Sequence, residues 1–189
     1  TPGEMPTATP GEMPTATPGE MPTATPKVSE DGGLWIEDIV SQKYNGKAIK
    51  PEVKVYDGNV LLTSKDYSIS YKNNINVGTA TVTVSGRGNY TGKDIVTFEI
   101  EPKDLADEDI LVNDVSAIIK DGKVKNPKVT VKFGKKTLAA STAAKVKDYY
   151  FQWPELKKDE KGNIIPGTYE VTILGSGNYT GQTTFTYEI

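Results

Sequence analysis

The pentapeptide GNYTG occurs twice, at residues 88–92 and 177–181, and holds the residue types most open to chemistry. Each copy contains an Asn-x-Thr triplet, the acceptor pattern for N-linked glycans in exported proteins. The same residues also suit a tight turn, because glycine adopts positive φ without steric cost and asparagine tolerates it. We interpret both copies as turns, with Tyr90 and Tyr179 folded over the end of the core and their hydroxyls at the wet rim. We predict that Asn89 and Asn178 are unmodified.

The segment DYYFQW, residues 148–153, is the second candidate for chemistry because of its aromatic side chains. If it is a strand, side chains alternate between two faces. One face then holds Tyr149, Phe151 and Trp153, and the other holds Tyr150 and Gln152. The first face should point inward, which places Trp153 in the core. Tyr150 stands where the matching segment DYSISY has Ser68, and an exposed aromatic ring can line a ligand site. Tyr150 and Gln152 are therefore the candidate ligand-binding residues, with the loop 154–164 as their wall.

Acidic residues gather between the two repeats, at Asp104, Asp107, Glu108 and Asp109. Their oxygens could bind calcium, but the spacing is not that of an EF-hand loop, and we interpret the cluster as a solvated linker. The chain has no Cys and no His, which excludes thiolate catalysis, Ser-His-Asp triads and most zinc sites. A carboxylate pair for glycoside hydrolysis needs a cleft that a small sandwich has little room for. We expect no enzyme, no catalytic residue, no metal and no cofactor.

The sequence around these candidate residues has the pattern of β-strands. Short segments rich in Val, Ile, Thr and Tyr, which mostly alternate apolar with polar residues, predict strands at 48–56, 66–71, 78–86 and 94–100. No segment between them has a sustained helical period. The sequence therefore predicts an all-β fold built as an antiparallel sandwich. Its inward side chains should be Val53, Val55, Ile69, Val82, Val84 and Phe98, then Val129, Val131, Phe151, Val171, Ile173 and Phe185.

This series of strands occurs twice. GRGNYTGKDIVTFEI at 86–100 matches GSGNYTGQTTFTYEI at 175–189, an offset of 89 residues. Farther upstream the offset falls, first to 82 and then to 76, so the second copy has two insertions. These lie near 139–145 and 154–164, at opposite ends of the strand that holds Tyr149. We predict two tandem modules, at 34–101 and 102–189, joined end to end with limited bending.

The beginning of the chain has a different composition. TPGEMPTA is repeated three times within residues 1–24, and proline at every fourth position removes backbone donors and fixes φ. Neither a helix nor a sheet can form from such a sequence. We predict an extended Pro/Thr-rich linker over residues 1–33. Because the chain begins with Thr rather than Met, we expect it to be a piece of a longer polypeptide.

The order YNGKAIKP, DYSISYKNN, VGTATVTVSGRGNYTG and TFEI resembles the bacterial Ig-like repeats of Gram-positive surface and secreted proteins. The resemblance covers nearly all of 39–100 and, more loosely, the second module. It implies compact tandem β-sandwiches that act as a stalk beside other domains of the same polypeptide, outside the cell or at its surface. Some bacterial Ig-like stalks contain Lys–Asn crosslinks, but neither closing strand here contains Asn. The resemblance implies no catalytic residues.

Charge and hydropathy limit the partners further. The chain has 22 basic and 25 acidic residues, a formal net charge of −3, so it lacks the basic field that nucleic acid requires. No apolar run is long enough to insert into a membrane. We therefore expect a non-catalytic structural spacer. The alternative is a carbohydrate-binding or other adhesin module that binds a cell-surface, dietary or host glycan through the second domain.

Overall fold

The computed structural model describes residues 33–113, 118–120 and 123–189. Every regular element in these ranges is a β-strand, so the all-β prediction is confirmed. None of the described residues forms a helix long and apolar enough to cross a membrane. The linker predicted over 1–33 lies outside the described residues, apart from Gly33.

The first half of the described chain, residues 34–101, contains two sheets. Its strands are β1 Leu34–Ile36, β2 Gln42–Lys43, β3 Val55–Asp57, β4 Val60–Leu61, β5 Tyr67–Lys72, β6 Gly78–Gly86 and β7 Lys93–Glu101. One sheet has the order β2-β7-β6-β5 and the other β1-β3-β4. The pairs β5–β6 and β6–β7 are antiparallel, whereas β2 runs parallel to β7. The arrangement is consistent with a small β-sandwich.

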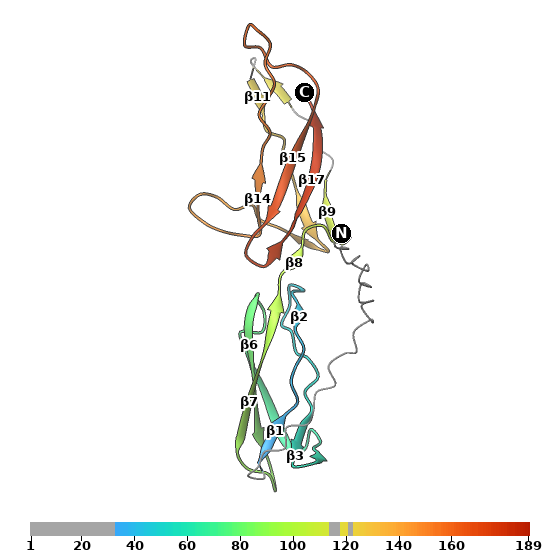
Figure 1. Cartoon of the computed structure of the whole chain (residues 1–189), viewed down its shortest axis with the longest axis vertical. Coiled ribbons are helices and arrows are strands. Elements are labelled where there is room, and N and C mark those ends of the chain that lie inside the picture. The colour runs from blue at the N-terminus through green and yellow to red at the C-terminus, as the bar shows by residue number, and fades with distance from the viewer. Residues whose placement is uncertain (1–32, 114–117, 121–122) are drawn as a thin grey trace, which may run out of the picture.

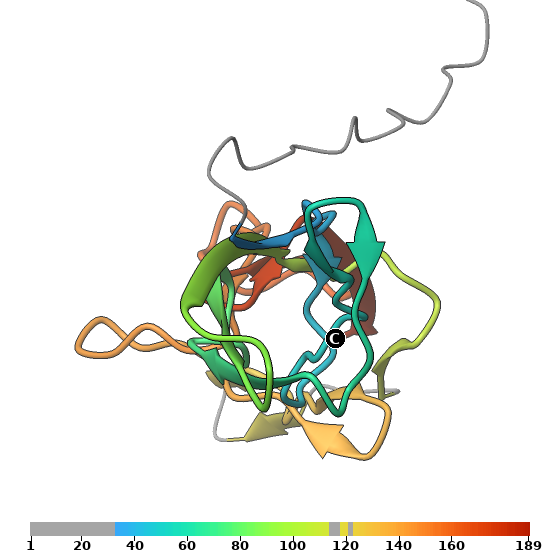
Figure 2. The ribbon, with the colours of Figure 1, turned by 90° about the horizontal axis from the view of Figure 1, so that it is seen from below.

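The second half, residues 103–189, repeats part of this plan. Its strands are β8 Lys103–Asp104, β9 Ile110–Val112, β10 Ile118–Lys120, β11 Lys123–Lys125, β12 Val131–Phe133, β13 Lys136–Thr137, β14 Tyr149–Gln152, β15 Thr168–Gly175, β16 Tyr179–Thr180 and β17 Gln182–Glu188. The sheet β14-β15-β17 corresponds to β5-β6-β7, and β13-β12-β9 faces it as β4-β3-β1 does in the first half. Figure 1 shows the two halves end to end, and in the end-on view of Figure 2 they project over one another.

Alternation of side chains explains the central strands. In β6 the apolar residues Ala80, Val82 and Val84 are fully buried, whereas the threonines between them are not. The strands predicted at 66–71, 78–86 and 94–100 are therefore confirmed to within one residue at each end. The prediction for 48–56 is wrong over most of its length, because only Val55–Asp57 pairs as a strand. Pro51 lies in the unpaired part, and proline has no N–H to donate to a sheet.

Most buried side chains form one large cluster that includes residues of both halves, and Tyr169, Val171 and Tyr187 form a second, smaller cluster in the second half. Six predicted core residues are fully buried, namely Val55, Val82, Val84, Val131, Val171 and Ile173, and Val53 and Phe98 are also buried. Ile69, Val129, Phe151 and Phe185 are partly buried and pack against the large cluster. Leu105, which follows β8, is 1% exposed and belongs to the same cluster. The hydrophobic core thus continues through the connection between the halves.

Candidate functional site

The second copy of GNYTG lies at the junction between the two halves. The chain leaves β7 at Glu101, and β8 then pairs in parallel with β16, so that Lys103 is opposite Tyr179. The Lys103 amide donates to the Asn178 carbonyl at 3.0 Å, and the Leu105 amide donates to the Thr180 carbonyl at 2.9 Å. The connecting segment is therefore held as a strand against the turn of the second half.

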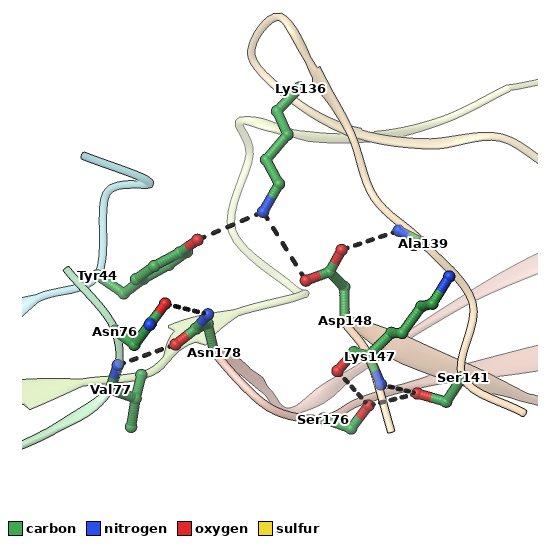
Figure 3. Close-up of polar contacts among 10 residues, drawn as sticks. All are labelled: Tyr44, Asn76, Val77, Lys136, Ala139, Ser141, Lys147, Asp148, Ser176 and Asn178. Atoms are coloured by element: carbon green, nitrogen blue, oxygen red, sulfur yellow. Dashed lines mark hydrogen bonds and ion pairs between the residues drawn. The ribbon is translucent and has the colours of Figure 1, made fainter. Parts of the chain in front are cut away.

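The Asn178 side chain crosses from the second half to the first (Figure 3). Its Oδ1 accepts a hydrogen bond from the backbone N–H of Val77 at 2.8 Å. Its Nδ2 donates to Asn76 Oδ1 at 3.1 Å. Both partners lie in the loop between β5 and β6, 101 and 102 residues earlier in the chain. The turn prediction for this asparagine accounts for its backbone, but its carboxamide is used for a contact that the motif alone does not reveal.

Tyr179 is packed into the same junction. Its ring is 2% exposed and meets Tyr44 of the first half edge to face, with centroids 5.5 Å apart. The hydroxyl is buried and has no hydrogen-bond partner among the described residues. Burial, with Tyr44 close by, raises the pKa of Tyr179 well above its ordinary value. The expectation that this hydroxyl lies at the wet rim is wrong, because the first half covers it.

A lysine completes the contact between the halves. Lys136 Nζ donates to the Tyr44 hydroxyl at 3.3 Å and lies 3.8 Å from Asp148 Oδ1 (Figure 3). The same ammonium is 5.8 Å from the ring centroid of Tyr44 and 5.5 Å from that of Tyr179. Cations over tyrosine faces at such distances are attracted by the ring quadrupole. Asp148 is fixed in turn, since its Oδ2 accepts from the Ala139 amide at 2.8 Å.

The acidic cluster beside the junction is organised around Lys103. Its Nζ lies 2.7 Å from Asp107 Oδ2 and 2.7 Å from Asp109 Oδ1, and the hydrogen bond from Lys103 lowers the pKa of Asp107. Asp104 Oδ1 accepts from the Ala106 amide at 2.9 Å. Within the described ranges, no group of three or more Asp or Glu residues is arranged to hold a metal ion.

Tyr150 and Gln152 both lie on the outward face of β14, whose burial alternates as the period of the segment predicts. Tyr150 is 47% exposed, and Trp153 packs on the opposite side against Phe151, Phe185 and Tyr187. A shallow depression surrounds Tyr150 and is lined by Ser141, Thr142, Ala143, Val146, Tyr150 and Ser176. Gln152 does not line it.

The wall of this depression is not the one expected from the sequence. Residues 141–146 form it, because they lead into β14 at the end that carries Tyr150, whereas 154–164 follows the other end. The two loops are visible at opposite ends of β14 in Figure 1. The wall is held in place by Ser141, whose Oγ accepts from the Lys147 amide at 2.8 Å and lies 3.0 Å from Ser176 Oγ.

Comparisons with family models, with curated proteins and with solved structures found no match to this chain. Two features of the described residues remain as candidates for function. One is the junction, where Asn178, Tyr179 and Lys136 join the halves. The other is the depression at Tyr150. The first connects the two halves, and the second is open at the surface of the second half.

Proposed function

We propose that the chain is a non-catalytic spacer that holds other parts of a bacterial surface or secreted polypeptide at a fixed separation. The observation that supports this most directly is the junction. Asn178 makes two side-chain hydrogen bonds to the first half, at 2.8 and 3.1 Å. Two β-rich halves placed end to end also agree with the resemblance to the Ig-like repeats of surface proteins.

Packing and backbone pairing hold the two halves in line. Adjacent domains move relative to one another unless their interface is well packed and apolar. Here Leu105 and Tyr179 are almost fully buried, and the parallel pairing of β8 with β16 removes the freedom of the linker. Lys136 adds a polar contact to Tyr44 at the rim. A joint of this kind keeps the ends of the molecule apart, which is what a spacer requires.

Distance measurements between spin labels test this function. The chain has no Cys, so the double variant Ser70→Cys, Thr186→Cys accepts one label on an exposed strand position of each half. We expect a narrow distance distribution that broadens when Asn178→Ala is added. Asn89→Ala, the same change in the first copy of the turn, is the matched control and should leave the distribution unchanged. A distribution that is already broad without Asn178→Ala would rule the spacer out.

A second candidate function is carbohydrate binding at Tyr150. The depression around this ring combines apolar surface from Val146 and Tyr150 with the hydroxyl side chains of Ser141, Thr142 and Ser176. Large exposed apolar side chains beside hydroxyl groups are the composition that a sugar ring can stack on and hydrogen-bond to. Val146 is 73% exposed, so the ligand face is open to solvent.

A glycan array or affinity gel tests the second function. We expect wild-type protein to be retained and Tyr150→Ala to lose retention with its melting temperature unchanged, because the ring is half exposed. Gln152→Ala, on the same face but outside the depression, should still be retained. Trp153→Ala lowers stability instead, since that ring packs in the core of the second half. Failure of the wild-type protein to bind any glycan would leave only the spacer.

A further inference from the structure

The two GNYTG turns share their closing hydrogen bond and the φ angle of their first glycine. They differ farther on, since a Cβ at Gly86 would meet the Tyr90 carbonyl and one at Gly175 the Thr180 carbonyl. The amide of Gly86 donates to the carbonyl of Gly92 at 3.1 Å, and the amide of Gly175 donates to the carbonyl of Gly181 at 2.9 Å. The φ angles of Gly88 and Gly177 are 62° and 64°. The first turn therefore presents its asparagine from a turn closed in the same way as the one that docks at the junction.

Only the second turn has a partner. Asn178 bonds to the first half, whereas Asn89 is exposed and its side chain makes no hydrogen bond within the described part of the chain. Both turns lie at the end where the chain enters their half. In the first half, a hydrogen bond joins the first strand to the residues that follow the turn: the Ile36 amide donates to Asp94 Oδ2 at 3.0 Å. A module lying end to end against this entry of the first half would therefore meet Asn89 as the first half meets Asn178.

The end of the first half that contacts Asn178, here called the receiving end, supplies particular groups. In the first half it offers the N–H of Val77, the carboxamide of Asn76 and the ring of Tyr44. The corresponding end of the second half is identified by its backbone pairing. Two hydrogen bonds join Gly167 and Ile189, at 3.1 and 3.0 Å, and they match the pairing of Gly78 with Ile100 in the first half.

This register places Pro166 where the first half has Val77, and Ile165 where it has Asn76. Proline has no N–H to donate, and an isoleucine side chain can neither donate nor accept a hydrogen bond. Ile165 is 41% exposed at this end. The far end of the second half therefore lacks the hydrogen-bonding groups that hold Asn178 in the first.

We infer that the turn at 87–92 is a docking surface for another β-module whose far end carries the receiving groups of the first half: an asparagine, a backbone N–H and a tyrosine ring. The far end of the second half ends such a stack. A second copy of this chain does not fit head to tail, because it would present Pro166. The inference rests on the proposed spacer function and adds the direction in which its units join.

An added module tests the inference. We would insert a second copy of residues 34–101 between Thr25 and Pro26. The segments 26–33 and 102–109 each have eight residues and begin with Pro-Lys, so the new junction has the spacing of the existing one. With labels at Ser70→Cys in both copies, we expect a narrow distance distribution that broadens when Asn89→Ala is introduced in the copy that follows the new junction.

Two comparisons make the result decisive. Inserting residues 102–189 at the same place should give a broad distance distribution across the new junction that Asn89→Ala leaves unchanged, because the far end of this module carries Pro166. A new junction that is as narrow with this insert, or that Asn89→Ala does not affect with the first insert, overturns the inference. Asn178→Ala in the unextended chain reports separately on the spacer function. Circular dichroism of each extended chain verifies that the added module is folded.

Discussion

At the scale of single residues, the junction depends on a tyrosine whose polar atom is left without a partner. Tyr179 contributes its ring to a cluster with Tyr44 and Phe133, at centroid distances of 5.5 and 6.3 Å. Its hydroxyl is buried without a hydrogen bond in the described structure. An unpaired buried hydroxyl costs about 1–3 kcal/mol in desolvation. The ring therefore stabilises the joint while the hydroxyl weakens it.

The substitution Tyr179→Phe should raise stability by about 1 kcal/mol at neutral pH, since it removes only the unpaired hydroxyl. It should also change the response to alkali. The pKa of Tyr179 is raised in the folded state, so the folded chain holds this proton more tightly than the unfolded chain. The associated stability is complete below the unfolded pKa of about 10 and is lost as the pH rises above it.

Urea unfolding between neutral and strongly alkaline pH measures this effect. Wild-type stability should fall above the ordinary tyrosine pKa, and the fall should be shallower in Tyr179→Phe. Tyr150→Phe is the matched control for the substitution itself, because Tyr150 is 47% exposed and removal of its hydroxyl should change stability at neutral pH by about 0.5 kcal/mol or less. Equal slopes for wild type and Tyr179→Phe would contradict the assignment of a buried, unpaired hydroxyl.

At the scale of elements, the sequence predicts the central strands and the faces of β14 because both depend on a local period of two. Tyr149 is buried and Tyr150 exposed, as this period requires. The contact between Asn178 and Val77 could not be predicted in this way, since it joins residues from different repeats. The wall beside Tyr150 was misplaced for a related reason: the offsets locate both insertions, but not which of them lines the surface beside Tyr150.

The turns themselves offer a matched pair of substitutions. Gly88 and Gly177 have nearly equal positive φ angles, 62° and 64°. A Cβ at Gly88 meets no atom within 4 Å, whereas one at Gly177 would lie 2.6 Å from the Lys147 carbonyl oxygen. Gly88→Ala should cost about 1–2 kcal/mol, the penalty of the left-handed conformation alone. Gly177→Ala should cost more, because the loop before β14 must also move.

Urea unfolding of the two glycine variants decides this point, and a probe near the loop adds detail. Tyr150 lies beside residues 141–146, so the displacement caused by Gly177→Ala should alter the NMR signals of this depression. Gly88→Ala should leave those signals as they are in wild type. Equal losses of stability in the two variants would mean that the loop yields without cost.

At the scale of the whole molecule, the buried cluster that crosses the junction couples the two halves. Leu105 belongs to this cluster and is 1% exposed. Its amide donates a hydrogen bond to the Thr180 carbonyl at 2.9 Å. Interactions between halves stabilise each half only while the other is folded. Unfolding of one half therefore removes contacts from the other, and the described chain should unfold in a single transition.

Shortening Leu105 should break this coupling. Leu105→Ala removes a fully buried side chain at the joint, which costs about 2–5 kcal/mol, and we expect calorimetry to resolve two transitions where wild type shows one. Leu111→Ala is the control, because Leu111 lies on β9 with 60% of its surface exposed and its loss should change stability by about 0.5 kcal/mol or less. If Leu105→Ala lowers the melting temperature but keeps one transition, the halves are coupled through the polar contacts of Asn178 and Lys136 instead. If Leu105→Ala melts like wild type, the apolar cluster does not couple the halves, and the rigidity of the proposed spacer cannot depend on it.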